Sequence, residues 1–309
     1  MTERQPKDLA ASVRQRLLNW SQRQQLDFQY VLTRYGIERL LYRLSRSPFS
    51  DQFVLKGAML FVAWEGWSPR PTRDVDLLGR GEHNADQLRS VFEALCRLEV
   101  EPDGLVFHPD MVKVTDLRED QAYGGQRVQL RASLGLARID VQVDIGYGDA
   151  VLPPPARLTF PTLLDLPAPV ILAYPRETVV AEKYHALVTL GLANSRMKDF
   201  YDLWALARQF TFEGATLARA IESTFRRRQT PLPTSAPVAL TADFYGDPNK
   251  RAMWQAFLTR NRLNADGLQL DQVAERLREF LLPPTMAVAQ GASFDQHWSA
   301  DLSWHPATL

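Results

Sequence analysis

Two carboxylates in the segment TRDVDLL, residues 72–78, are placed for metal chemistry. Residues two apart in a β-strand project to the same side, so Asp74 and Asp76 share a small volume while Val75 and Leu77 face a core. Like charges at that spacing repel each other, and Mg²⁺ relieves such repulsion by binding one or two carboxylates together with substrate phosphates. The pair alone also fits an ordinary surface strand, so its context has to decide.

A second strand supplies a candidate third acid. In RIDVQVDI, residues 138–145, the apolar residues alternate with Asp140, Gln142 and Asp144. Such alternation predicts a core strand whose polar side faces water or a cleft. A cleft shared with Asp74 and Asp76 would complete a three-carboxylate metal site with Asp144.

The residues before the acidic pair suggest a phosphate site. A short apolar run, residues 53–55, breaks at Lys56 and Gly57 and continues as an apolar segment, residues 58–64, that suits a helix. Backbone N–H groups at a helix start can hold a triphosphate while nearby carboxylates hold its Mg²⁺.

A further polar cluster falls in a helical region. Arg196, Asp199 and Asp202 are spaced i, i+3, i+6 and form one ridge on a helix. An intrahelical salt-bridge ladder is one interpretation. Lys183, in a largely apolar helix, has to reach water or find phosphate or carboxylate partners, which favours a functional interpretation.

The rest of the pattern indicates the elements that position these residues. Proline-rich residues 150–175 predict an extended connector, and we place the domain boundary there, giving domains 1–160 and 161–309. Cys96 falls on the buried side of a helix, so we interpret it as a core residue. The predicted helices cover 8–46 (two helices), 85–98, 176–192, 197–209, a segment around 254–258, and 270–281; the predicted strands cover 106–117, 127–132 and 138–145.

Composition sets limits on the class of protein. With 309 residues, 45% of them hydrophobic, the chain can form about two globular domains. Its 36 basic and 36 acidic residues cancel, so any nucleic-acid surface has to be local. Residues 1–50 hold nine Lys or Arg against four acids, which fits either a solvated helical face or an RNA-phosphate surface.

Several classes are disfavoured. One cysteine excludes an internal disulfide framework, and no histidine pair has zinc-ligand spacing. There is no Walker A loop and no nucleophile elbow. No run of about 18 apolar residues occurs, so we expect a cytoplasmic protein without a membrane partner.

Five motifs in order carry a family resemblance: FVLKGAMLF, RPTRDVDLL, VQVDIGYGD, ETVVAEKYHAL and SRMKDFYDL. Together they span about residues 50–205 and resemble the AbiEii/AbiGii nucleotidyltransferase toxins, a family that includes the mycobacterial MenT toxins. The resemblance implies an α+β fold, with a polymerase-beta-like nucleotidyltransferase core around a mixed sheet and a mainly helical C-terminal domain. It also implies transfer of NMP from an NTP to an RNA acceptor, the tRNA 3′ end, with Mg²⁺, which would block translation, and a cognate antitoxin.

Carried over residue by residue, the resemblance assigns roles to the candidate site. Asp74 and Asp76 are the implied metal pair and Asp144 the third acid. Lys56 and Gly57 form the phosphate-approaching turn, although Ala58 stands where related enzymes commonly have serine. The remaining implied residues are Lys183 at the nucleotide phosphates and Asp199 and Asp202 as the acids of the helical motif.

The departing pyrophosphate and the acceptor need positive charge. We expect Arg73 to stabilise the pyrophosphate, together with Lys56 and Lys183. The RNA would be held by the N-terminal helices or by Arg226, Arg227 and Arg228. Two other functions stay open on the sequence: nucleotide transfer to a protein or to a small molecule such as an aminoglycoside, and a catalytically silent interaction module.

Overall fold

The protein folds as two compact units. The computed structural model describes residues 8–65, 72, 74–81, 84–117, 124–263 and 267–307. The first unit comprises residues 1–148 and 156–173, and the second comprises residues 149–155 and 174–309. The chain therefore enters the second unit at Asp149, returns at Ala156 and leaves again at Tyr174. That residues 1–160 and 161–309 form the two domains stays a prediction.

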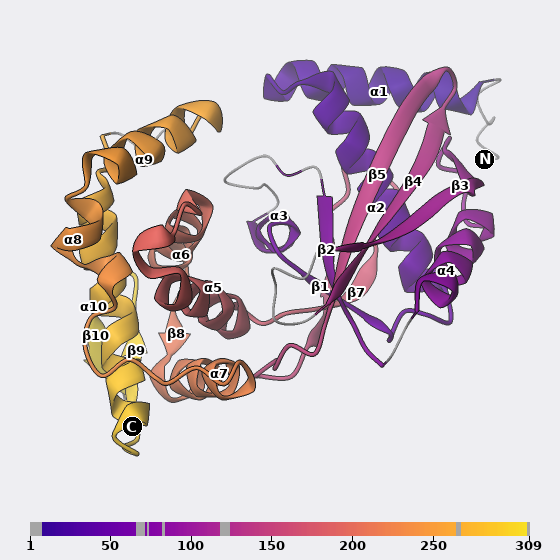
Figure 1. The fold of residues 1–309 in the computed structure, drawn as a ribbon. Coiled ribbons are helices and arrows are strands. Elements are labelled where there is room, and N and C mark those ends of the chain that lie inside the picture. Colours follow the sequence, from indigo (N-terminus) through magenta and orange to yellow (C-terminus); the bar gives the residue numbers. More distant parts are fainter. Residues whose placement is uncertain are drawn as a thin grey trace. The chain divides into compact units, whose positions relative to one another are not determined.

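A mixed seven-stranded sheet forms the centre of the first unit (Figure 1). Its order is β3-β4-β5-β2-β1-β7-β6. The β2–β5 and β1–β7 pairs are parallel and the others antiparallel. This mixed sheet and the helices around it confirm the predicted fold class. The strands are β1 (Phe53–Lys56), β2 (Asp74–Gly79), β3 (Val106–Leu117), β4 (Gly125–Leu134), β5 (Ala137–Tyr147), β6 (Ala156–Thr159) and β7 (Val170–Ala173).

The two faces of the sheet differ in polarity. On β5, Ile139, Val141, Val143 and Ile145 are at most 2% exposed, which confirms the predicted core face. Helices cover this face: the Cβ position of Gly36 lies against Ile139 and Val141. They are α1 (Leu9–Gln24), α2 (Phe28–Arg46) and α4 (Ala85–Arg97), while α3 (Met59–Glu65) follows β1. Apolar residues at alternate positions thus leave the polar residues of β2, β4 and β5 together on the other face.

The proline-rich connector contains two strands that the sequence did not predict. β7 pairs in parallel with β1, and β6 pairs with β7 at the edge of the sheet. Pro161, Pro167 and Pro169 fall in the loop between these strands, where a missing N–H costs no ladder hydrogen bond. Strand formation here depends on the partner β1, about a hundred residues earlier, and local composition carries no sign of it.

A buried polar cluster ties this loop to α2. Glu38, fully buried, accepts a hydrogen bond on Oε2 from the backbone N–H of Leu163 at 2.7 Å. Arg39 donates from Nη2 to the carbonyl of Pro167 at 2.7 Å. Burial raises the pKa of Glu38 to about 7, against the lowering effects of the Leu163 N–H and Arg39.

The second unit is mainly helical, with a small three-stranded sheet of order β10-β9-β8. The predicted helices after residue 175 are confirmed, and α7 and α8 are additional ones. The elements are α5 (Arg176–Leu190), α6 (Met197–Gln209), α7 (Gly214–Arg227), α8 (Ala242–Tyr245), α9 (Pro248–Arg260) and α10 (Leu270–Ala289), with β8 (Phe212–Glu213), β9 (Gln296–Trp298) and β10 (Trp304–Pro306).

The predicted helix end at Leu281 is wrong, because α10 continues through Pro283 and Pro284 to Ala289. Each proline lacks the N–H that would bond the carbonyl four residues earlier, namely Glu279 and Phe280. The indole N–H of Trp304 supplies the donor, at 3.1 Å from the Glu279 oxygen and 3.2 Å from the Phe280 oxygen. A distant residue thus compensates for the missing bonds.

None of the helices in the described ranges combines the length and the hydropathy that a membrane span needs.

Replacing Glu38 by Gln tests the buried cluster. A carboxyl whose pKa is raised on folding stabilises the protein below its unfolded pKa, about 4.5, and this contribution is lost as the pH rises through about 7. We expect the wild-type free energy of unfolding to fall by up to about 3 kcal/mol over that window relative to Glu38→Gln. Urea unfolding at half-unit pH steps measures the difference. Parallel pH curves for the two proteins would contradict the assignment.

Candidate active site

Four charged residues lie in one row across the polar face of the sheet. Asp76 on β2 is the register partner of Asp144 on β5. On the outer sides of this pair, Lys56 of β1 is opposite Asp76 and Arg127 of β4 is opposite Asp144. Register partners on neighbouring strands lie about 5 Å apart and share a face. The row therefore places two carboxylates side by side with a cation at each end.

Arg127 holds Asp144 in a bidentate ion pair. Its Nε and Nη2 donate to Oδ1 and Oδ2, both at 2.8 Å. The hydrogen bond to Asp144 comes first among the causes that raise the pKa of Arg127, and the charges of Asp74 and Asp76 add to it. All three acids thus lie within electrostatic reach of one guanidinium. Sequence reasoning missed Arg127, although its alternation with the buried Val128 placed it on the acidic face.

Gly57 makes room for Asp76. Its φ of +71° lies in the left-handed region, and a Cβ at this position would clash with the Oδ2 and Cγ atoms of Asp76. The turn leads directly into α3, where the Leu60 N–H donates to the Gly57 carbonyl at 3.2 Å. The sequence predicted a phosphate contact for this glycine. The structure adds a second requirement: residue 57 has to lack a Cβ so that the Asp76 carboxylate fits beside it.

Gly146 similarly makes room for Lys56. The Nζ of Lys56 is 2.9 Å from the point that a Cβ of Gly146 would occupy. Gly146 follows Asp144 by two residues on β5, so the ammonium lies on the same face as the acids. Gly57 and Gly146 therefore leave the space that the side chains of Asp76 and Lys56 occupy.

Asp74 lies at the start of β2, opposite Gln142. Its Oδ1 accepts a hydrogen bond from the hydroxyl of Thr72 at 2.5 Å, and Thr72 is buried. This contact fixes the rotamer of the first acid. Arg73, predicted to stabilise the pyrophosphate, lies outside the described residues.

The donor set suits a hard divalent cation. Asp74, Asp76 and Asp144 offer carboxylate oxygens alone, the ligands that Mg²⁺ takes. Within the described ranges, no three acidic, imidazole or thiol side chains are gathered closely enough to form a complete metal cluster. Both oxygens of Asp144 bond to Arg127, whose positive charge offsets the repulsion among the acids.

Lys183 bridges two helices of the second unit. Its Nζ donates to Asp199 Oδ1 at 2.9 Å and to Asp202 Oδ2 at 2.7 Å, and both acids are fully buried. Arg196 reaches Asp199 from the same helical segment at 2.8 Å. The ladder interpretation thus holds for Arg196 and Asp199, but the Lys183 pairs join α5 to α6. The Lys183 side chain is 14% exposed.

Among the arginines considered for RNA, Arg226 and Arg228 pair with acids, and Arg228 is the more buried of the two. It lies 2.7 Å from Asp149 and 3.2 Å from Glu182. Arg226 makes an exposed pair with Glu222. Arg228 therefore serves to hold residue 149 to the second unit.

Cys96 behaves as the predicted core residue. It is buried, and burial raises the pKa of its thiol to about 11, so it is poorly suited to act as a nucleophile.

A known protein family matches most of the chain. The family model described as "Nucleotidyl transferase AbiEii toxin, Type IV TA system" matches residues 39–279. No curated protein matches the chain. Among solved structures, JHP933 from Helicobacter pylori is 15% identical with a TM-score of 0.42, covering 82% of this chain and 86% of its own.

A second H. pylori structure, provisionally assigned as a nucleotidyltransferase, is 15% identical with a TM-score of 0.44. The match covers 86% of this chain and 95% of that one.

Gly57→Ala tests the seat of Asp76, with Gly81→Ala as its matched control. Gly81 has a φ of +81° and nothing within 4 Å of its Cβ position, so both variants carry the same left-handed strain, about 1–2 kcal/mol. Only Gly57→Ala displaces Asp76. We expect a larger loss of thermal stability for Gly57→Ala, because its Cβ also meets Asp76, and a drop of about 100-fold or more in nucleotidyl transfer for Gly57→Ala alone. Equal activity in the two variants would contradict the role of Gly57.

Lys183→Met tests the buried bridge between α5 and α6. It leaves two buried carboxylates without their shared ammonium, which costs about 3–5 kcal/mol. Arg226→Gln removes an exposed pair and should cost less than about 1 kcal/mol. Urea unfolding of the full chain measures both changes. A Lys183→Met protein as stable as Arg226→Gln would show that the bridge does not hold the helices together.

Proposed function

Since the chain belongs to the AbiEii nucleotidyl transferase toxins of type IV toxin–antitoxin systems, we propose that it transfers NMP from an NTP to an RNA acceptor, the tRNA 3′ end. A tRNA with a blocked end cannot be charged, so translation would stop. Membership of this family makes the chain an enzyme and implies an antitoxin partner. It leaves no support for a silent interaction module.

One observation carries the proposal for the site: Asp76 and Asp144 are register partners on adjacent parallel strands. Asp74 precedes Asp76 by two residues and therefore projects to the same face. Lys56 and Arg127 flank the pair in the same row. Carboxylates for a cation and cations for a phosphate chain thus share one surface of the first unit.

The proposed reaction is an in-line displacement at the α-phosphorus. The oxygen of the acceptor hydroxyl forms a bond to that phosphorus, and the bond from the phosphorus to the α–β bridging oxygen breaks. Pyrophosphate leaves, and the hydroxyl proton passes to water. Negative charge accumulates on the departing group, where the ammonium of Lys56 stabilises it, with Arg73 in the same predicted role.

Asp74, Asp76 and Asp144 would hold Mg²⁺, which when bound lowers the pKa of the acceptor hydroxyl and neutralises triphosphate charge. The Thr72 hydroxyl and the Gly57 turn orient Asp74 and Asp76. Arg127 orients Asp144 through its ion pair with that carboxylate. The residues of this chain thus prepare the site before substrate arrives.

In the second unit, we assign the nucleotide phosphates to Lys183. Its ammonium carries three N–H donors and is not fully buried, which supports the assignment. Asp199 and Asp202 are fully buried and act through Lys183 by fixing its position.

The RNA acceptor is supported by the exposed arginines of α1, a helix without acids, whereas three arginines of α2 from the same basic segment are buried. The cytoplasm, where NTPs and tRNA meet, is the proposed place of action. The remaining rival is transfer to a protein or to a small amine, and it predicts label on those acceptors instead.

The test uses purified protein, each α-labelled NTP in turn, Mg²⁺, total tRNA and total protein. We expect label in tRNA, and a loss of about 100-fold or more for Asp76→Asn and Asp144→Asn. Asp140→Asn is the matched control. Like Asp144, Asp140 lies on the polar face of β5 and pairs with an arginine, Arg131 at 2.7 Å, but its side chain is 74% exposed.

Each outcome has a distinct meaning. Label that reaches protein or a small molecule, but not RNA, would refute the acceptor and keep the chemistry. Full activity in Asp144→Asn, equal to that of Asp140→Asn, would refute the three-acid site.

A further inference from the structure

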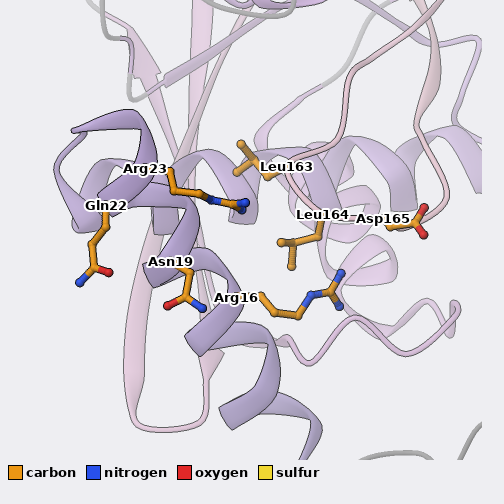
Figure 2. Close-up of a pocket in the computed structure, with 7 residues that line it drawn as sticks. All are labelled: Arg16, Asn19, Gln22, Arg23, Leu163, Leu164 and Asp165. Atoms are coloured by element: carbon orange, nitrogen blue, oxygen red, sulfur yellow. The ribbon is translucent and has the colours of Figure 1, made fainter.

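A pocket of about 700 Å³ lies between α1 and the loop that precedes β7 (Figure 2). Helix α1 lines it with two arginines and two amides: Arg16, Asn19, Gln22 and Arg23. The loop contributes Leu163, Leu164 and Asp165. Its volume falls in the range of ordinary ligand sites, about 300–1,000 Å³.

Both walls of the pocket are fixed. The opposite side of α1 is anchored by the buried Val13 and Leu17. The loop is held by the hydrogen bond from the Leu163 N–H to the buried Glu38. Since neither wall depends on a ligand for its position, the pocket is preformed.

The pocket offers positive charge and hydrogen-bond donors. Helix α1, LAASVRQRLLNWSQRQ, contains arginine, glutamine and asparagine but no acid, although acidic and basic residues balance over the whole chain. Within the described residues, no carboxylate forms an ion pair with Arg16 or Arg23. The Asp165 carboxylate points away from both guanidinium groups in Figure 2. Charge complementarity therefore selects an anion.

The spacing selects an anion with more than one charged centre. Arg16 and Arg23 are seven residues apart, which is about 10 Å along the helix, so each can engage a phosphate of its own. Each guanidinium can bind a phosphate in a bidentate manner. Asn19 and Gln22 lie between the two arginines in the sequence. Their amide groups both donate and accept hydrogen bonds, as a ribose hydroxyl requires.

The location separates this pocket from the catalytic acids. Gly36 of α2 packs on Ile139 and Val141, the apolar face of β5, whereas Asp144 faces the other way. The loop that bears Leu163 is bonded to the same helix, at Glu38. The pocket thus lies on the helix-covered side of the sheet, and one nucleotide cannot fill both sites.

We propose that this pocket binds two backbone phosphates of the RNA acceptor, at a distance from the end that is modified. The inference rests on the proposed function and adds a requirement: the acceptor has to be a folded RNA large enough to reach around the sheet. A mononucleotide or a short oligonucleotide acceptor would not use the pocket.

The experiment measures binding of total tRNA, without NTP, to the full chain and to Arg16→Gln/Arg23→Gln. We expect a loss of about tenfold or more in affinity. The slope of log K against log salt concentration should fall by nearly two, about 0.9 for each phosphate that the variant no longer neutralises. Arg14→Gln is the matched control: the same helix carries it, but it stacks over Phe28 and lies outside the pocket. Unchanged thermal unfolding confirms that both variants fold.

Labelling of tRNA, run in parallel, separates the two proposals. If wild-type protein labels tRNA but the double variant binds it like Arg14→Gln, the pocket assignment is overturned and the proposed function stands. If wild-type protein neither binds nor labels tRNA, both fall. If the double variant keeps its tRNA affinity but escapes neutralisation by the antitoxin, the pocket serves a protein partner and the assignment is wrong.

Discussion

The register between β2 and β5 is the constraint on which the candidate site depends. It places Asp76 beside Asp144 on the polar face of the sheet. A shift of one residue would turn every side chain of β2 over and send both of its acids into the core. The buried Val75 and Leu77 oppose such a shift, so the hydrophobic effect that stabilises the sheet also keeps the acids in place. Stability and chemistry thus follow from the same alternation.

Gathering acids on one face creates repulsion, and the protein offsets it with residues from outer strands. Arg127 and Lys56 close the row at its two ends, and glycines at positions 57 and 146 supply the space that this crowding needs. The second unit follows the same rule, with Lys183 between two buried acids. In each case the acids are paired with a cation from a different strand or helix. Neither cluster can therefore form within a single isolated segment of the chain.

Local alternation was enough to predict β1 to β5, the placement of Asp74 and Asp76 on one face of β2, and the buried face of β5. It was not enough for relations between distant segments. The partner of Asp144 lies on β4, that of Asp202 lies on another helix, and β7 exists because β1 is available to pair with it. Gly57 was recognised as a turn, but its contact with Asp76 depends on how two strands pair. The predicted helix end at Leu281 was wrong. Pro283 and Pro284 lack the backbone N–H donors of a helix, and no residue near them in the sequence shows that Trp304 replaces these donors.

That replacement has a consequence for the order of assembly. The carbonyl groups of Glu279 and Phe280 receive their donor from Trp304. A ribosome finishes α10 before it makes Trp304, so this part of the helix carries unmet carbonyl groups while the first unit already has all its strands. In a growing cell, the first unit can therefore assemble on the nascent chain before Trp304 completes the hydrogen bonding of α10.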